Sequence, residues 1–556
     1  MSNILLILFP SQLFEPKYIE KIFSYTEANI KIKFKHICLW EHPYFFTKFK
    51  YHKKKLIFHR ATMKKYYDTI KLSKYEKFYF NTTDSINILN KYIKFNQIDQ
   101  IRFFNPIEKE LIQMITANKI INHIEKIIFP SPYFLNSTNF DKNKNINNEL
   151  GGTGGQGLDE LGELGESGKT GESGGLGKTG GSGGSTRLKH NLFYKSQRIM
   201  YNIMVKKIGD KYIPEGSKWS YDTENRSPFE KSQLEPEILK FKSKKRLEYL
   251  NEAVEYVEKN FSSHYGSSDL ENFIYPIDRE EATEWLKHFI SHKLDNFGKY
   301  EDAMSSKIKF GFHSILSPLT NIGLVTPLDI IEQTSKYKNN MASKEGFIRQ
   351  VIGWREYCYF TYDFYGKYME SNFIYTLNKY PISKYIWECS TQITPIDNIL
   401  KNVTLNAYSH HIERLMGIGN FLVLIETNPK EIYNWFQTMY IDAYDVFMIP
   451  NVYGMLCYGK LNENSHMMTR PYFASSNYIM KMSDYKSAIT VKIGSNNYKW
   501  DDIMDSLYWY HIYKYSDVFK KIYATSSGVA RWEKFENEKK NNIIKLAKLY
   551  IKWIHN

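Results

Sequence analysis

The sequence predicts an N-terminal α/β domain built on a parallel sheet, followed by an all-α domain, with a glycine-rich segment between them. Three observations predict this order. Short, apolar and β-branched runs alternate with helical stretches at the start of the chain. Residues 150–186 consist mainly of Gly, Ser and Thr and contain no aromatic residue. From residue 233 onward, long stretches show the 3.6-residue periodicity of amphipathic helices.

The N-terminal domain is expected to span residues 1–140. Its strands are predicted at 3–9, 34–40, 99–104 and 125–129, with helices between them that include 60–73 and 84–95. Parallel strands require a crossover connection, and a helix is the usual one. The alternation therefore predicts a parallel sheet with helical crossovers.

Residues 150–186 are expected to form a flexible tether, because a Gly- and Ser-rich segment buries too little apolar surface to offset the entropy lost on ordering. A docking segment that uses its mixed acidic and basic side chains is the alternative. A connecting segment is expected over 187–270, and the helical domain over 271–556. Helices of that domain are predicted at 278–295, 344–363, 398–425 and 431–447.

The composition narrows the function classes. The chain has 556 residues, a net charge of +15 and a pI near 9.1. Excess positive charge favours a polyanionic partner such as nucleic acid, although a lysine-biased composition explains the same charge. The four cysteines are scattered and form no CxxC pair, which argues against a disulfide framework or a cysteine-bound zinc site and fits an intracellular compartment. No apolar run is long enough to span a membrane.

Two segments carry side chains suited to holding a ligand. Ser317 followed by Pro318 predicts a helix start with the Ser317 hydroxyl as N-cap, and the free N–H groups there suit an anion. An ordinary cap is the alternative. Gln350 and Trp354 are one helical turn apart, so a helix places a hydrogen-bonding edge and a stacking surface on one face. A core helix explains that pattern equally well.

Two other segments carry titratable groups within apolar surroundings. His410 and His411 open a predicted helix, and Arg414 follows three residues later, so His411 and Arg414 can reach the same cavity. Histidine exchanges a proton near neutral pH, although a core histidine is the alternative. Asp442 lies among apolar residues and needs a cationic partner. We predict an ion pair between Asp442 and Arg414.

In this order, the motifs resemble the iron–sulfur bacterial class of the photolyase/cryptochrome family. The segments that match its flavin domain are FHSILSPLTNIGLVTP (312–327), EGFIRQVIGWREY (345–357), AYSHHIERLMGIGNF (407–421), YIDAYDVFMIPNVYGM (440–455), TRPYFASSNYIMKMSDY (469–485) and LYW (507–509). KWSYDTENR (218–226) resembles the connecting segment of that class. FPSQLF (9–14) and KYHKKKLIFHRATMKKYYD (50–68) resemble its antenna domain.

The resemblance implies a Rossmann-like antenna domain and an all-α domain that holds a U-shaped FAD. It assigns Tyr300, Ser314, Leu316 and Ser317 to the phosphates and ribityl region of FAD, Arg349 and Arg355 to its side, and the Arg414–Asp442 pair to the isoalloxazine ring. His411 matches the proton donor of (6-4) photolyases, and His410, Gln350, Trp354 and Tyr472 match lesion-pocket residues. Trp387 and Trp435 match the electron-relay tryptophans of the class.

The sequence also departs from this class. The four cysteines that hold its [4Fe–4S] cluster correspond to Pro395, Lys486, Ile489 and Asp502, none of which supplies a thiolate, so no cluster is expected. Phe436 replaces a tyrosine of the electron relay, and Met448 replaces a carboxylate near flavin N5. In the antenna motif Ser11 replaces an aspartate while Gln12 is retained, which leaves a lumazine-type antenna open.

The sequence thus predicts a light-driven DNA repair enzyme without a metal site. Its expected partner is double-stranded DNA with UV lesions, its expected state is a monomer, and the histidine pair favours the (6-4) photoproduct as substrate. The alternatives are a cyclobutane pyrimidine dimer photolyase, a cryptochrome-type blue-light sensor without repair, and a DNA-binding protein that has lost its flavin.

Overall fold

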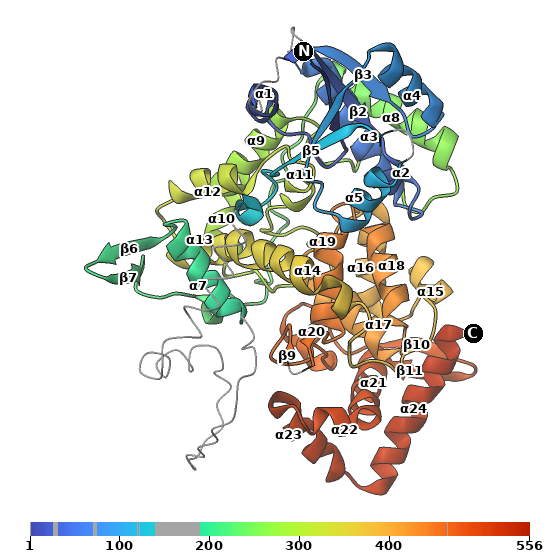
Figure 1. Cartoon of the computed structure of the whole chain (residues 1–556). Helices are drawn as coiled ribbons and strands as arrows, with labels where there is room; N and C mark the ends of the chain where they lie inside the picture. Colours follow the sequence, from blue (N-terminus) through green and yellow to red (C-terminus); the bar gives the residue numbers. More distant parts are fainter. Residues whose placement is uncertain are drawn as a thin grey trace.

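The computed structural model describes residues 2–25, 32–70, 75–118, 121, 123–138, 189–463 and 465–556. It contains an N-terminal α/β region and a largely helical C-terminal part, in agreement with the predicted fold class (Figure 1). The glycine-rich segment 150–186, for which a tether is predicted, lies outside the described residues. Within the described ranges, no helix combines the length and apolar character needed to cross a lipid bilayer.

The α/β region is built on a five-stranded parallel sheet with the strand order β3-β2-β1-β4-β5. The central strand β1 pairs on both sides, with Ile4 opposite Lys35 of β2 and Gln100 of β4. Residues Ile4 to Leu8 are fully buried, as expected for the middle of a parallel sheet. The strands are β1 (Ser2–Leu8), β2 (Ile32–Trp40), β3 (Glu76–Phe80), β4 (Gln100–Phe104) and β5 (Glu125–Phe129).

The four predicted strands are confirmed, and β3 is an additional edge strand that the sequence did not predict. Of its five residues only Phe80 is buried, so the run lacks the continuous apolar signal of a central strand. The helices of this region are α1 (Pro16–Ser24), α2 (Pro43–Phe46), α3 (Lys53–Thr69), α4 (Ile86–Phe95) and α5 (Lys109–Thr116). Helix α3 begins seven residues before its predicted start, where His52 accepts a hydrogen bond from the Lys54 backbone N–H.

The connecting segment divides between the two parts of the molecule. Helix α7 (His190–Met200) packs against the π-helical residues Arg349–Arg355, whereas α8 (Lys244–Phe261) packs against α3 of the α/β region. Between α7 and α8 lies a hairpin formed by β6 (Val205–Ile208) and β7 (Lys211–Pro214). This segment therefore takes part in both regions and is more than a linker.

The prediction of a single helix over 398–425 is wrong. Helix α16 (Thr394–Asn406) ends at Ala407, which adopts a left-handed conformation with φ +54°. The chain then continues without helical structure to His410, and a new helix begins at His411. Apolar periodicity continues across the break, so it could not reveal that a non-glycine residue ends the helix here.

The prediction of a helix over 431–447 is wrong in the same way. Helix α18 (Pro429–Met439) ends before a turn at residues 440–444, after which α19 begins at Asp445. By contrast, the helix predicted at 344–363 is continuous from Met341 to Met369, with a π-helical stretch in its middle. π-Helical turns often occur at functional sites.

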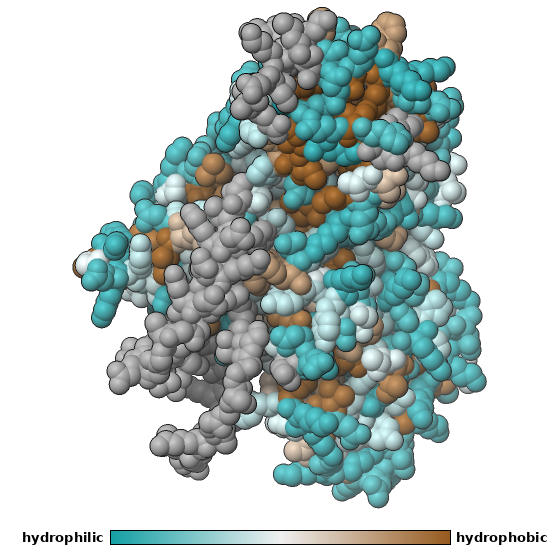
Figure 2. All heavy atoms as spheres, viewed as in Figure 1, coloured by the Kyte–Doolittle hydropathy of each residue, from teal (hydrophilic) through white to brown (hydrophobic). Residues whose placement is uncertain are grey.

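The remaining helices lie C-terminal to α8. They are α9 (Arg279–His288), α10 (Leu294–Phe297), α11 (Ser317–Thr320), α12 (Pro327–Ser335), α13 (Met341–Ile348), α14 (Glu356–Met369), α15 (Lys384–Trp387), α17 (Asn420–Leu424), α19 (Asp445–Met448), α20 (Ser476–Lys481), α21 (Trp500–Lys514), α22 (Ser516–Phe519), α23 (Tyr523–Glu533) and α24 (Asn537–His555). The π-helical segments are Phe289–Lys293, Arg349–Arg355, Glu413–Gly419 and Ile449–Leu456. On the face shown in Figure 2, hydrophilic residues cover most of the C-terminal helices.

The helical part also contains two small hairpins, β8 (Lys460–Asn462) with β9 (Ser465–His466) and β10 (Ile489–Ile493) with β11 (Asn496–Lys499). The second hairpin contains one of the positions matched to cluster cysteines. Gln392 binds it by accepting from the Lys492 N–H at 2.5 Å, and its carbonyl accepts from the Thr490 hydroxyl at 2.8 Å. Trp500, which is almost fully buried, donates from Nε1 to the Lys486 carbonyl at 2.9 Å. Hydrogen bonds and packing thus hold these segments together.

Glu356 anchors the end of the α/β region on helix α14. Its carboxyl oxygens accept hydrogen bonds from the backbone N–H groups of Leu135 and Asn136 and from the Asn136 side-chain amide, at 2.9 to 3.1 Å. The group is fully buried, and this burial raises the pKa of Glu356 to about 7. The folded state therefore holds a proton here that the unfolded chain releases at lower pH.

We expect the free energy of unfolding to fall as the pH rises from the ordinary glutamate range through about 7, because the proton on Glu356 stabilises the folded state and is lost over this window. Urea unfolding of the parent and of Glu356→Gln at several pH values between 4.5 and 8 measures this dependence. The variant should show a smaller decline over the same window, whatever its absolute stability. An identical decline in both proteins would show that other groups cause it.

Candidate functional site

A cavity of about 610 Å³ lies in the helical part, within the size range of sites for small molecules and cofactors. Its walls come from segments far apart in the sequence: α7, the 220–226 stretch, α11, the π-helical stretch of the 341–369 helix, the helix that begins at His411, and residues 436–456. Nine residues predicted for the site line it: Ser317, Arg349, Gln350, Trp354, Arg355, His411, Arg414, Asp442 and Tyr472.

The predicted ion pair between Arg414 and Asp442 is confirmed. Arg414 binds both carboxylate oxygens, with Nη1 2.9 Å from Oδ1 and Nη2 3.1 Å from Oδ2, and its Nε donates to the Ser409 carbonyl at 2.7 Å. The guanidinium carbon lies 4.2 Å from the ring centre of Tyr440. Such a two-pronged pair fixes both side chains, and its charges are compensated where they are largely removed from water.

Ser317 has a different role from the predicted one. Helix α11 has only four residues, its N-cap position is Leu316, and no side chain caps it. The Ser317 hydroxyl instead donates to Asp442 Oδ2, and the Asn321 side chain donates to the Asp442 carbonyl at 2.8 Å. The prediction of a Ser317 cap is therefore wrong, because the buried carboxylate is the stronger acceptor. The hydroxyl becomes part of the Arg414–Asp442 network.

Two further arginines lie at the cavity with different electrostatic surroundings. Arg349 is buried beside three carboxylates, with Nη1 3.0 Å from Asp222, Nη2 3.5 Å from Glu301 and Nε 3.5 Å from Glu345. Among the described residues, Arg355 has no carboxylate at this range; its Nη1 donates to Asn321 Oδ1 at 2.6 Å. Burial lowers the pKa of Arg355, whereas neighbouring carboxylates raise that of Arg349 against the effect of burial.

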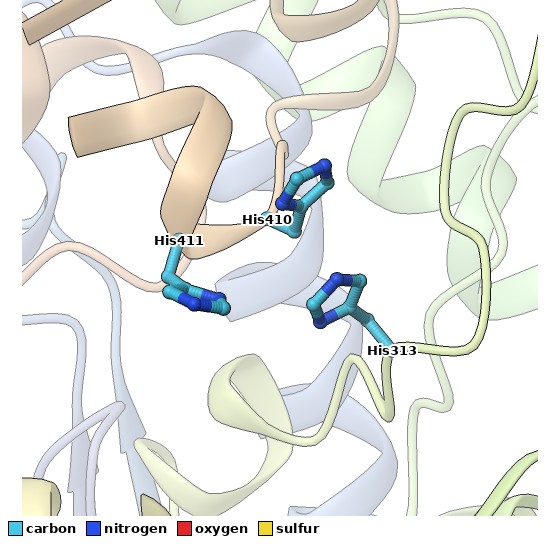
Figure 3. A group of neighbouring side chains, drawn as sticks. All are labelled: His313, His410 and His411. Carbon is cyan, nitrogen blue, oxygen red and sulfur yellow. The ribbon is translucent and has the colours of Figure 1, made fainter. Parts of the chain in front are cut away.

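The two predicted histidines occupy different environments. The His411 side chain is 47% exposed, lines the cavity and lies 3.5 Å from Asp302 through Nε2. His410 is buried and stacks on His313, with ring centres 4.5 Å apart and an interplanar angle of 6° (Figure 3). Burial lowers the pKa values of His410 and His313 well below the ordinary range. Only His411 of the predicted pair is therefore open to a ligand in the cavity.

The predicted stacking surface has a partner that the sequence did not suggest. Trp354 stacks on His190 with ring centres 3.8 Å apart, and both residues line the cavity. Gln350 Nε2 donates to Glu301 Oε1 at 2.5 Å. Gln350 and Trp354 both lie in the π-helical stretch, whose turns are wider than those of an α-helix. Both side chains line the cavity, as the prediction of one shared face requires.

The chain is similar to known proteins in sequence. Residues 18–148 and 181–273 match the family model described as deoxyribodipyrimidine photo-lyase-related protein. A (6-4) photolyase of Agrobacterium fabrum is 31% identical over 348 residues, which are 61% of this chain and 66% of that protein. The chain belongs to the photolyase/cryptochrome superfamily. Uncharacterized protein R855 of Acanthamoeba polyphaga mimivirus is 36% identical over 135 residues, which are 24% of this chain and 94% of that protein.

Two solved structures are similar in overall arrangement. A bacterial class III photolyase from Agrobacterium tumefaciens gives a TM-score of 0.49 at 12% identity, over 87% of this chain and 86% of that chain. A cryptochrome from Synechocystis sp. PCC6803 gives 0.48 at 11% identity, over 100% and 92%.

Three of the residues that the resemblance assigns to FAD do not line the cavity. Tyr300 stacks on Phe312, and its hydroxyl donates to Glu230 at 3.1 Å. Ser314 lies at a separate small cavity, where its carbonyl accepts from Trp285 Nε1. Leu316 is buried in the hydrophobic core. In this structure these three side chains belong to the packing around the cavity wall.

The predicted relay tryptophans lie in one line of aromatic rings. Phe436 lines the cavity and contacts Trp435 with ring centres 5.4 Å apart, and Trp435 lies 6.5 Å from Trp387. Trp387 stacks on the half-buried Tyr265 at 4.0 Å. Tyr265 was missed because it belongs to the connecting segment, to which the sequence assigned no site residue. The line connects the cavity wall with the outer part of the helical region.

The side chain of Gln12, which was matched to the antenna motif, forms hydrogen bonds at the end of the sheet. It is buried, its Nε2 donates to the Phe104 carbonyl at 2.8 Å, and its Oε1 accepts from the Phe9 N–H at 3.4 Å. These contacts bridge the ends of the neighbouring strands β1 and β4, the place where open parallel sheets bind ligands. Gln12 therefore links the two strand ends directly.

Sequence reasoning missed the cavity residues of the connecting segment. They are His190, Asn191, Tyr194, Ser220, Asp222, Asn225 and Arg226. The motif 218–226 was the available signal, but a linker assignment hid its role. Asp222 of this motif, for example, forms an ion pair with Arg349 at the cavity.

We expect Asp442→Asn to lower the free energy of unfolding by about 3–5 kcal/mol, because it leaves the guanidinium of Arg414 buried without its counter-charge. Urea unfolding at constant pH measures the change. Glu533→Gln is the matched control, since its pair with Lys520 is about half exposed and ion pairs in solvent contribute little to stability. Equal effects of the two substitutions would contradict a structural role for the buried pair.

Proposed function

We propose that this chain is an FAD-dependent, light-driven DNA photolyase that acts on the (6-4) photoproduct. One observation carries the proposal: a cavity of cofactor size has the Arg414–Asp442 ion pair in its wall and a half-exposed histidine, His411, facing the same space. The similarity to a (6-4) photolyase over 348 residues supports the same activity.

The residues of the cavity fit FAD. Arg355 lies there without a carboxylate partner among the described residues, and its Nε has no hydrogen-bond partner there, so the site has cationic capacity left for an anionic group. Arg414, Asp442 and Ser317 form a preorganised polar wall suited to the edge of a flavin ring. Bound FAD would supply the light-driven electron that opens the lesion, and the protein would position the reactants.

The net charge and the aromatic side chains of the cavity support DNA as the partner. A net charge of +15 favours the phosphate backbone. A damaged dipyrimidine is poorly stacked, so moving it out of the helix costs less than for intact bases. Trp354 and Tyr472 offer aromatic surfaces for it, and His190 supports the Trp354 ring from one side.

His411 is the proposed proton donor. Reversal of the (6-4) photoproduct returns a hydroxyl between the two rings, so a proton must be delivered in the reaction. Asp302, 3.5 Å from Nε2, orients the imidazole, while the exposed part of the ring faces the cavity. His410 is buried beneath it and is proposed to support the position of His411.

A cryptochrome-type light sensor is the second candidate, and Met448 is the observation that favours it. This residue is buried and lines the cavity at the position where the related class has a carboxylate near flavin N5. A thioether neither exchanges a proton nor carries charge, so the redox behaviour of a flavin here would differ. Repair assays separate the two candidates.

We expect the purified protein to carry a single FAD per chain and no iron. The reasons are the fit of the cavity and the absence of cysteine from the four positions matched to cluster ligands. Flavin absorbance and iron and sulfide analysis of the same sample measure both. About four irons per chain would show that other groups hold a cluster, and absence of flavin would remove the basis for both light-dependent functions.

We expect His411→Ala to reduce (6-4) repair by about two to four orders of magnitude, the usual contribution of a positioned general acid, while FAD stays bound. Repair of a defined (6-4) oligonucleotide under blue light measures it, with flavin occupancy checked in each sample. The matched control is His292→Ala, which removes an exposed histidine on a surface helix and should leave repair unchanged.

Three outcomes would contradict parts of this proposal. Parent-like (6-4) repair by His411→Ala would make His411 dispensable. Repair of cyclobutane dimers but not of (6-4) lesions by the parent would change the substrate. If the parent binds FAD and repairs neither lesion, the sensor function takes its place.

A further inference from the structure

Three histidines converge at one side of the cavity. One ring nitrogen from each of His313, His410 and His411 lies within 4.8 Å of the others. His313 comes from the loop before α11, and the other two come from the start of the helix that carries Arg414 (Figure 3). The proposed repair chemistry uses only His411, so it does not explain this convergence.

Two of these rings carry buried nitrogens without a partner. His313 Nε2 and His410 Nδ1 form no hydrogen bond with any described residue, although both side chains are more than nine-tenths buried. A buried polar atom without a hydrogen-bond partner destabilises the folded protein unless another group or an ion satisfies it. An imidazole binds a metal ion through a ring nitrogen that carries no proton, so an ion is a partner that such buried nitrogens can accept.

Carboxyl groups lie behind two of the rings. Asp302 Oδ1 is 3.5 Å from His411 Nε2, and Glu413 Oε1 is 3.6 Å from His410 Nε2. Metal-bound histidines usually direct the second ring nitrogen to a carboxylate or carbonyl, which orients the ring and strengthens it as a ligand. The trio therefore has both the inner ligands and the outer support of a metal site.

We propose that His313, His410 and His411 bind a divalent transition-metal ion, with Zn²⁺ as the best fit. Three imidazoles plus one open position is a coordination set that zinc adopts, and imidazole suits zinc better than calcium or magnesium. The half-exposed His411 lies on the cavity side, where water or a ligand can reach the fourth position. Zn–N bonds of about 2.0–2.1 Å require the three rings to move closer, and the stacked rings of His313 and His410 have to tilt so that a nitrogen of each points to the ion. The partly exposed His411 has room to follow.

The consequence for repair rests on the proposed function. A metal ion on His411 takes up the ring nitrogen and holds the side chain in the inner group of ligands. The imidazole then cannot deliver a proton to a lesion. Zn²⁺ bound here would thus inhibit (6-4) repair reversibly.

The binding test uses the full chain in a His288→Gln/His292→Gln background. These two histidines are four residues apart and stack at 4.4 Å on the surface, so they form a second chelating pair that has to be removed. Calorimetric titration with ZnCl₂ measures affinity, and Co²⁺ absorbance reports the coordination geometry. We expect one Zn²⁺ per chain, with His411→Ala and His313→Ala each weakening binding by at least about tenfold.

His411→Ala is the decisive variant, because its side chain is half exposed and its loss does not create a core cavity. Thermal unfolding checks that both variants are folded. Loss of all zinc binding in the background protein, or unchanged affinity in folded His411→Ala, would overturn the metal site. Repair is measured separately, first with Zn²⁺ and then after addition of EDTA. If zinc binds through the three histidines but the protein repairs no lesion, the metal site stands and the proposed function is refuted.

Discussion

Two buried carboxylates, Asp442 in the turn after α18 and Asp445 at the start of α19, have to be neutralised, and their partners come from both regions of the molecule. Asp442 faces the cavity and pairs with Arg414. Asp445 faces the α/β region, where it accepts from the Tyr44 hydroxyl at 2.8 Å and lies 3.0 Å from Lys48 Nζ. An unpaired buried charge is very costly, so the turn fixes the cavity wall and the contact between the two regions together.

This arrangement explains why the helix predicted over 431–447 has to be interrupted. In a continuous helix, residues three apart project on nearly the same side, and Asp442 and Asp445 could not face opposite partners. The turn at 440–444 separates their directions. Glu108 lies close to Asp445 as well, and its pKa is raised by burial and by that neighbouring carboxylate. The junction between the regions is thus built on hydrogen bonds and an ion pair as well as on apolar packing.

The segments matched to the cluster ligands also have to be held together. In proteins with a [4Fe–4S] cluster, four thiolates tie distant segments together. Here the described residues use a different connection: Gln392 binds the β10–β11 hairpin through backbone groups, and Trp500 packs beneath it with its N–H satisfied. Directional hydrogen bonds and a buried aromatic residue therefore connect these segments.

The sequence by itself determined the fold class and much of the cavity. Apolar runs identified four of the five strands, since strands of a parallel sheet covered by helices are rich in apolar residues. The isolated Asp442 identified Arg414, since a buried charge needs a partner. Only the tertiary structure decided where helices stop, as at Ala407, because periodicity is blind to a single left-handed residue. It alone brought His313 to His410 and His190 to Trp354, because residues 97 and 164 positions apart meet through packing that no local pattern encodes.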